Sequence, residues 1–88
     1  MVVGTTRGGD GMLSAYVLIE SEVGKVAHVA QAMRDLDDVQ LAEDLAGPYD
    51  IIARVQASGL DELGRLIVFR IQVLDGVTRT LTCMVLHR

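Results

Sequence analysis

The chain of 88 residues is poor in aromatic side chains, with two tyrosines, one phenylalanine and no tryptophan. Proteins that hold single-stranded nucleic acid need aromatic side chains on which the bases can stack. The formal net charge is −4, and no stretch of lysine and arginine forms a basic stripe. Because electrostatic attraction to phosphates dominates nucleic-acid binding, we expect no direct contact with DNA or RNA.

Cysteine and histidine are scarce too, with one cysteine and two histidines. A metal site needs a cluster of His, Cys or carboxylate side chains, and His28 and His87 stand far apart in the sequence. Cys83 lies among aliphatic residues, so we expect a small buried hydrophobe rather than a nucleophile or a disulfide partner. The sequence therefore predicts no metal site, no cofactor and no catalytic residue.

Long apolar runs are missing as well. The uninterrupted apolar stretches are only a few residues long, whereas a membrane-spanning helix needs about 20. The N-terminus does not show the charged and apolar layout of a signal peptide. We therefore expect a cytoplasmic protein without membrane contact.

Hydrophobic residues, by contrast, make up 50% of the chain. A domain of this size buries only about 60% of the surface that its unfolded chain exposes. A single small monomeric core cannot bury so many hydrophobic side chains. This excess predicts a homo-oligomer whose interface completes the core.

The first residues differ from the rest in composition. Residues 1–11 are rich in glycine and show no apolar periodicity. We expect a flexible lead or tag-like segment over residues 1–13 and one folded domain over residues 14–88. An alternative is that Val2 and Val3 begin a short strand that pairs across a dimer, and the sequence leaves both open.

Three strands and a first helix are predicted in the first two thirds of the chain. Residues 15–19 form a continuous apolar run, which is typical of a strand covered on both faces. An amphipathic helix follows, and its apolar positions are Val26, Val29, Ala30, Met33 and Leu36. The next strand has Val39, Leu41 and Leu45 at its apolar positions, and residues 51–57 form the third strand.

A second helix and a fourth strand complete the prediction. Ser58 and Asp61 resemble a capping box that opens the helix, although Asp replaces the usual Glu or Gln. The residues that this helix turns inward are predicted to be Leu63, Leu66, Ile67, Ile71 and Leu74. Residues 77–86 form the last strand.

A weak internal repeat supports this order of elements. The segment Leu36–Val39 ends the first helix and Leu74–Val77 ends the second, at an offset of 38 residues. Two such halves predict an α+β fold of the ferredoxin-like type, β-α-β-β-α-β, with a four-stranded antiparallel sheet and two helices on one face. Because the other face would be bare and apolar, we expect it to dimerise by packing sheet against sheet.

The segment Gly47, Pro48, Tyr49 and Asp50 is the strongest functional signal. Pro48 presets the backbone for a turn that would hold Tyr49 and Asp50 beside a sheet edge, where a simple hairpin needs neither a phenol nor a carboxylate. Two interpretations stay open at this point. The turn is either part of a binding site or a rigid corner in which Asp50 closes an Asx-type hydrogen bond.

Two threonines of the last strand offer complementary chemistry. Thr80 and Thr82 share one face by the period of two, although threonine is also simply a good strand former. A free amino acid needs an acceptor for its ammonium group and donors for its carboxylate. Asp50 could supply the acceptor and the threonine hydroxyls some of the donors, while Tyr49 could wall the pocket for the side chain.

The ordered set of segments resembles the effector-binding domain of the Lrp/AsnC (feast/famine) transcription regulators. The likeness covers residues 15–86 and rests on the run 15–20, the helix that begins near Gly24, the turn 47–52, Asp61–Leu63 and the ending 76–82. The resemblance implies dimers that pair through their sheets, assembly into octamers or decamers, and amino-acid effectors bound between dimers. It also implies a ligand site lined by Gly47, Pro48, Tyr49, Asp50, Thr80 and Thr82, with Asp61 and Glu62 as weaker candidates.

The chain departs from full-length members of that family in one respect, because no helix-turn-helix precedes the domain. It looks like a stand-alone form that senses an amino acid or joins a full-length Lrp/AsnC-type regulator in a mixed assembly. A ligand-independent oligomerisation module is one alternative. A small dimeric enzyme of the ferredoxin-like type, such as a monooxygenase, is less favoured because the strands offer almost only aliphatic side chains.

Overall fold

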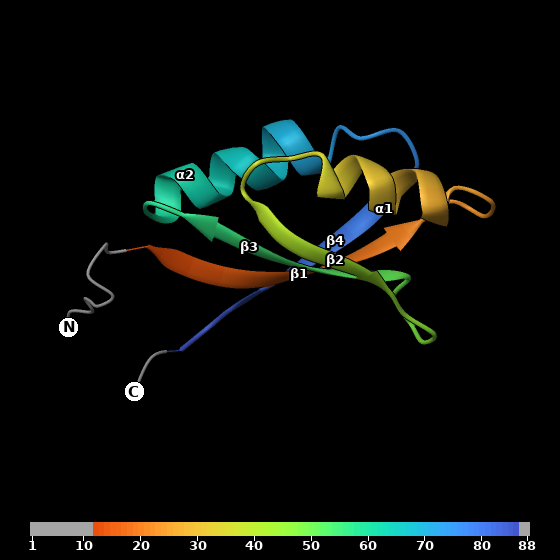
Figure 1. Cartoon of the computed structure of the whole chain (residues 1–88), viewed down its shortest axis with the longest axis horizontal. Coiled ribbons are helices and arrows are strands. Elements are labelled where there is room, and N and C mark those ends of the chain that lie inside the picture. Colours follow the sequence, from red (N-terminus) through yellow and green to blue (C-terminus); the bar gives the residue numbers. More distant parts are fainter. Residues whose placement is uncertain (1–11, 87–88) are drawn as a thin grey trace.

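The computed structural model describes residues 12–86, and Figure 1 shows two helices lying over one face of a sheet. The elements follow the predicted order β-α-β-β-α-β. Their bounds are β1 Leu13–Ser21, α1 Val26–Arg34, β2 Val39–Asp44, β3 Ile51–Ala57, α2 Leu60–Arg65, which continues as the π-helical segment η2 Leu66–Ile71, and β4 Val77–Met84.

The four strands form one antiparallel sheet in the order β2-β3-β1-β4. The two central strands come from different halves of the chain, and Val17 of β1 pairs with Ala53 of β3. Strands β2 and β4 are the edges. Because β1 lies between β3 and β4, its C-terminal end stands beside the first residues of both neighbours.

The hydrophobic core lies between the sheet and the two helices. Alternate residues of β1 and β3 point to the helix layer, and Val17, Ile19, Ile51 and Val55 are fully buried there. Val29 and Met33 of α1 cover them from above. The alternation that a strand imposes on its side chains therefore gives the sheet one dry face.

The second helix places its apolar positions inward as predicted, but it begins differently. Leu63, Leu66 and Ile71 are buried against the core. The predicted capping box is wrong, because Gly59 occupies the N-cap position and no side chain of the described residues caps this end. Ser58 lies one residue too early to accept a hydrogen bond from the first turn.

The internal repeat has a structural counterpart in the two links from helix to strand. In the first link the Val39 amide donates to the Leu36 carbonyl at 3.1 Å, and in the second the Val77 amide donates to the Leu74 carbonyl at 3.1 Å. The same short turn therefore directs each helix back into the sheet. The two halves of the chain are structurally similar units.

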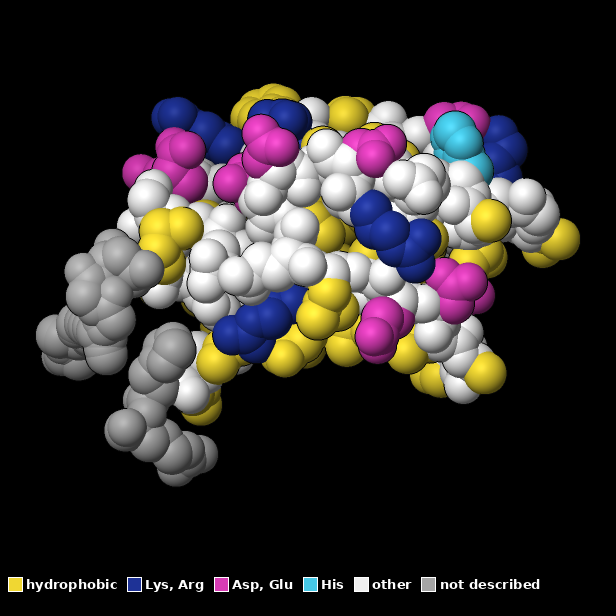
Figure 2. All heavy atoms as spheres, in the orientation of Figure 1, with side chains coloured by type: hydrophobic (Ala, Val, Ile, Leu, Met, Phe, Trp, Pro, Cys, Tyr) yellow, Lys and Arg dark blue, Asp and Glu magenta, His cyan; other side chains and the backbone are white. Residues whose placement is uncertain are grey.

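The face of the sheet away from the helices is bare in this single chain. Apolar atoms gather along the lower edge of the molecule in Figure 2, below the sheet. Leu18 and Ile52 pair with each other on this face and are half-buried, and Leu81 beside Leu18 is 45% exposed. The uncovered face that the sequence predicted is present, but it is not wholly apolar, because Tyr16 and Arg54 pair on it and Arg54 Nη1 donates to the Tyr16 hydroxyl at 2.8 Å.

Two sequence expectations fail on the edge strands. Cys83 is exposed, not buried, because it lies on the bare face of an edge strand that no helix covers. In β2 the pairing shifts between Val39 and Leu41, so Val39 is buried while Leu41 is exposed. This irregularity breaks the period of two, and Ala42 takes the second buried place.

The ends of the chain lie largely outside the described residues. Residues 1–11 of the expected lead 1–13 are not described, and the alternative strand at Val2 and Val3 lies among them. Leu13, at the end of the expected lead, is the first residue of β1. Residues 87–88 at the end of the expected domain lie outside as well. Between residues 12 and 86, no helix is long and apolar enough to cross a membrane.

Candidate functional site

The turn between β2 and β3 projects from one end of the sheet (Figure 1). The Leu45 amide donates to the Asp50 carbonyl at 2.8 Å and closes the turn. Gly47 and Pro48 are exposed, and Tyr49 and Asp50 are half-buried. The sequence therefore places a rigid, solvent-facing corner directly before a fully buried strand residue.

Asp50 connects this turn to the end of β1. Its backbone amide donates to the Ile19 carbonyl at 2.9 Å, and its carboxylate oxygen Oδ2 accepts the Ser21 amide at 2.8 Å. The bond is not a local Asx-type bond, because its partners are 29 residues apart. Asp50 therefore fixes the point at which β1 leaves the sheet, where the pairing with β4 becomes irregular between Glu20 and Ser21.

Thr80 lies at the same end of the sheet. Ile19 pairs with Ile51 on one side and with Thr80 on the other, so the start of β3 and the start of β4 flank one residue of β1. Two strand spacings separate them, roughly 10 Å. The Thr80 hydroxyl accepts a hydrogen bond from Gln72 Nε2 at 3.0 Å, which places it on the helix side of the sheet.

Thr82 stands two residues further along β4 on the same face. It pairs with Val17 and is half-buried. Two residues of a strand span roughly 7 Å, so Thr82 lies farther from the turn than Thr80 does. The predicted threonine pair thus forms a short row that leads away from the corner.

A contact that the sequence did not predict joins the turn to β4. The pKa of Arg79 is raised above its ordinary value, first by a side-chain hydrogen bond to Tyr49 and then by the charge of Glu20. Arg79 Nε lies 3.9 Å from Glu20 Oε1, and the Thr78 hydroxyl donates to the Glu20 carbonyl at 3.0 Å. No signal in the sequence could reveal this contact, because it depends on the order of the strands.

The weaker candidates Asp61 and Glu62 lie at the other end of β3. Helix α2 begins after Ala57, whereas the turn precedes Ile51. The seven residues of β3 span roughly 20 Å, so one chain does not bring these carboxylates to the turn. Glu62 instead pairs with Arg65 on its own helix, with 3.4 Å between Arg65 Nη1 and Glu62 Oε1.

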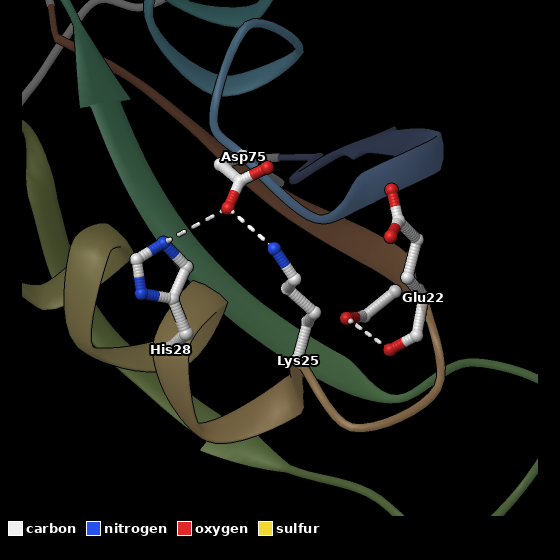
Figure 3. A network of polar contacts seen from close by, with 5 residues as sticks. Glu22, Lys25, His28 and Asp75 are labelled. Atoms are coloured by element: carbon white, nitrogen blue, oxygen red, sulfur yellow. Dashed lines mark hydrogen bonds and ion pairs between the residues drawn. The ribbon is translucent and has the colours of Figure 1, made fainter.

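An exposed polar network stands above the same end of the sheet, where α1 begins and η2 returns to β4 (Figure 3). Lys25 Nζ donates to Asp75 Oδ2 at 2.7 Å, and His28 Nε2 lies 3.8 Å from the same oxygen. The hydrogen bond from Lys25, together with its charge, lowers the pKa of Asp75 below its usual value. The Glu22 amide donates to the Gly76 carbonyl at 2.8 Å and ties the two loops together.

The site has no features of a metal centre. Among residues 12–86, no three His, Cys, Asp or Glu side chains lie close enough to hold a metal ion. What the structure brings together is the turn with Tyr49 and Asp50, the end of β1 and the start of β4 with Arg79 and Thr80. The turn and Arg79 offer a carboxylate, a phenol and a guanidinium at this end of the sheet, while the Thr80 hydroxyl lies on the helix side.

Comparisons with known proteins identify the domain type. A model of the Lrp/AsnC ligand binding domain matches residues 14–88. An uncharacterised HTH-type transcriptional regulator of Pyrococcus abyssi is 31% identical over 68 residues, which cover 77% of this chain and 43% of the relative. The chain therefore spans less than half the length of that regulator.

Solved structures share the fold. TTHA0845 from Thermus thermophilus superposes with a TM-score of 0.81 and 30% identity, over 86% of this chain and 95% of that one. The transcriptional regulator NMB0573 from Neisseria meningitidis, solved as an L-Met complex, has a TM-score of 0.81 at 17% identity. That match covers 91% of this chain and 53% of the regulator, and at this identity it shows the fold alone.

Proposed function

Because the chain belongs to the Lrp/AsnC ligand-binding domain family, whose role is regulatory and not enzymatic, we propose that it is a sensor module for a free amino acid. It regulates transcription indirectly, through ligand-dependent assembly or through mixed assembly with a full-length regulator. The proposed place of action is the cytoplasm. The proposed site is the end of the sheet that carries the turn 47–50.

One observation carries this proposal. Asp50 and Tyr49 of the turn lie at the end of the sheet where β4 begins, with Arg79 beside Tyr49 and with Thr80 on the helix side of the sheet. A carboxylate suits an ammonium group, and hydroxyl and backbone donors suit a carboxylate. The NMB0573 complex with L-Met supports the class of ligand, since it is a regulator of the same fold with an amino acid bound.

The proposed assembly uses the bare face of the sheet. Leu18, Ile52 and Leu81 leave apolar surface on this face that a second copy would cover by packing sheet against sheet. The turn 47–50 would then form part of a site that a neighbouring dimer completes. The dimers would assemble into a ring of eight or ten copies. Gly47, Pro48 and Thr82 line that site in the proposal, and Asp61 and Glu62 reach it only from another copy.

A second function is favoured by one contact. The Oδ2 atom of Asp50 already accepts the Ser21 amide, which is what a purely structural corner requires. Under this interpretation the domain is a ligand-independent oligomerisation module. The two functions differ in what they demand of the negative charge of Asp50, since the hydrogen bond to Ser21 needs only an acceptor oxygen.

A thermal-shift screen with the common amino acids tests the proposal. A ligand at 100 times its Kd stabilises the folded state by about 2.7 kcal/mol, so one amino acid or a chemically related group should raise Tm clearly. Asp50→Asn keeps an acceptor oxygen for Ser21 and removes the charge. We expect this variant to fold and to lose most of the ligand-induced shift, and Thr80→Val to lose part of it.

The matched control is Asp38→Asn, which removes an exposed carboxylate before β2, at the opposite end of the sheet. It should respond to the amino acid as the unchanged protein does. If no amino acid shifts Tm while the oligomer stays intact, the ligand-independent module is the better account. Equal shifts in the protein and in Asp50→Asn would exclude Asp50 as the ammonium acceptor.

A further inference from the structure

Two opposite charges lie at the end of the sheet where β4 begins, and they do not pair with each other. Asp50 bonds to one edge of β1, where its Oδ2 accepts the Ser21 amide, and its Oδ1 has no hydrogen-bond partner among the described residues. Arg79 stands on the other edge of β1, opposite Glu20. Since no ion pair joins Asp50 to Arg79 in the described part of the chain, each can bind a group from outside.

Arg79 lies on the uncovered side of the sheet, because the next residue, Thr80, lies on the helix side. Its guanidinium donates a side-chain hydrogen bond to Tyr49. Arg79 Nε is 3.9 Å from Glu20 Oε1, which is too far for a hydrogen bond. An arginine has five N–H donors, and 67% of this side chain is exposed. Most donors of Arg79 therefore have no partner within the described chain.

Tyr49 connects the two charges. It directly precedes Asp50 in the turn, and its hydroxyl receives the hydrogen bond from Arg79. The guanidinium of Arg79 is therefore held toward the turn, across the end of β1. The backbone amide of Asp50 donates to the Ile19 carbonyl at 2.9 Å, which fixes the carboxylate on the opposite edge. The cation and the anion are thus neighbours whose positions are set by separate bonds.

A free α-amino acid carries its ammonium group and its carboxylate on the same carbon atom. Its receptor needs an anion and a cation that are close together but not paired with each other. A planar guanidinium binds a carboxylate through two parallel N–H···O bonds. The hydroxyl of Thr80, in contrast, lies on the helix side and already accepts a hydrogen bond from Gln72. Arg79 is therefore better placed than Thr80 to bind a carboxylate beside the turn.

We propose that Arg79 binds the α-carboxylate of the amino acid while Asp50 binds its ammonium group, and that Tyr49 positions the guanidinium. This inference rests on the proposed sensing function and narrows the class of ligand to free zwitterions. A residue within a peptide lacks one or both of these charges. The module therefore distinguishes free amino acids from peptides.

Pairs of ligands that differ only in the carboxylate test the role of Arg79. Calorimetric titration is carried out with each common L-amino acid that raises Tm and with its carboxamide, for example L-methionine and L-methioninamide. The pH is chosen so that the ammonium groups of both ligands are protonated. The unchanged protein should bind the carboxamide about tenfold more weakly or worse, because the carboxamide loses a charge-assisted contact. In Arg79→Gln the Kd values of the two ligands should differ by less than about threefold.

Two further variants separate charge from geometry. Arg79→Lys keeps the positive charge but loses the planar fork, so it should restore only part of the preference for the amino acid over its carboxamide. Tyr49→Phe removes the hydroxyl that holds the guanidinium, and it should reduce this preference less than Arg79→Gln does. The matched control is Arg70→Gln, which removes the same charge from an exposed arginine of η2. That variant should keep both Kd values.

The outcomes distinguish this inference from the proposed function. If an amino acid binds but Arg79→Gln keeps the full preference over the carboxamide, Arg79 does not bind the carboxylate, and the sensing function stands without it. Equal Kd values for the amino acid and its carboxamide in the unchanged protein would overturn the inference in the same way. If no amino acid binds the unchanged protein, the sensing function fails, and the inference that rests on it fails too.

Discussion

The link from η2 to β4 and the turn between β2 and β3 lie at the same end of the sheet. They differ in how far contacts within one chain account for their residues. The link from η2 to β4 is fixed from within, because buried Gly76 has a φ of +101° and the Leu74 carbonyl closes the turn. The turn between β2 and β3 is anchored at its last two residues, where Asp50 meets β1 and Tyr49 meets Arg79. Gly47 and Pro48, by contrast, lie in the open.

The difference shows which residues the fold requires and which it leaves free for other contacts. A Cβ atom on Gly76 would lie 2.9 Å from Val29 Cγ2 and 3.0 Å from Lys25 Cβ. A Cβ atom on Gly47 would meet no described atom within 4 Å beyond its chain neighbours, and Gly47 is not among the glycines with a positive φ. The fold therefore accounts for Gly76, whereas no contact of the described chain requires a glycine at position 47.

The largest expected effect is that of Gly76→Ala. The substitution combines an unfavourable backbone conformation with a steric clash, and it should lower the free energy of unfolding by about 2 to 4 kcal/mol. Gly47→Ala should change it by less than about 0.5 kcal/mol, as is usual for exposed positions. Urea unfolding at one fixed protein concentration measures both. Equal losses in the two variants would remove the distinction between the connections.

An intermediate effect is expected at Asp50. Asp50→Ala leaves the Ser21 amide without its acceptor and should cost about 1 to 2 kcal/mol of unfolding free energy. Asp50→Asn retains an acceptor oxygen and should cost less than about 1 kcal/mol. Urea unfolding again provides the measurement. If Asp50→Asn lowers the free energy of unfolding as much as Asp50→Ala does, the negative charge of Asp50 itself stabilises the turn.

The smallest effect is expected at the ion pair between Lys25 and Asp75, beside the link from η2 to β4. Because Lys25 lowers the pKa of Asp75, this carboxylate stabilises the folded state above its unfolded pKa, and the contribution disappears as the pH falls through the lowered folded value. The difference in Tm between the protein and Asp75→Asn should therefore be present at neutral pH, shrink as the pH falls below the ordinary value of 3.8, and vanish below the lowered folded value.

Salt should reduce the same difference, since both side chains are exposed. The exposed Asp37 provides the control, and Asp37→Asn should show a smaller dependence on salt. A difference between the protein and Asp75→Asn that grows toward acid would contradict the assigned direction of the pKa shift.

Much of the fold could be predicted because its signals are local. The bounds of β3 at Ile51 and Ala57 are the predicted ones, and the inward residues of α1 follow from a period of 3.6. The errors concern features that depend on neighbouring strands. Cys83 is exposed because β4 is an edge, and Leu41 faces outward because the pairing of β2 shifts.

The candidate site was predictable in its parts but not in its arrangement. The turn and the threonines stand out as residue types, whereas the meeting of Asp50 with Ser21 and of Tyr49 with Arg79 depends on β1 lying between β3 and β4. Sequence periodicity carries no information about the order of strands. The role of these residues toward a ligand stays a prediction.

The most direct test of the central claim is a calorimetric titration with the amino acid that gives the largest thermal shift, carried out on the protein and on Gly47→Val. The added side chain occupies the space outside the turn that a ligand or a neighbouring copy would use. We predict an unchanged Tm without ligand and a Kd raised at least tenfold. Equal Kd values for the two proteins would contradict a ligand site at this turn.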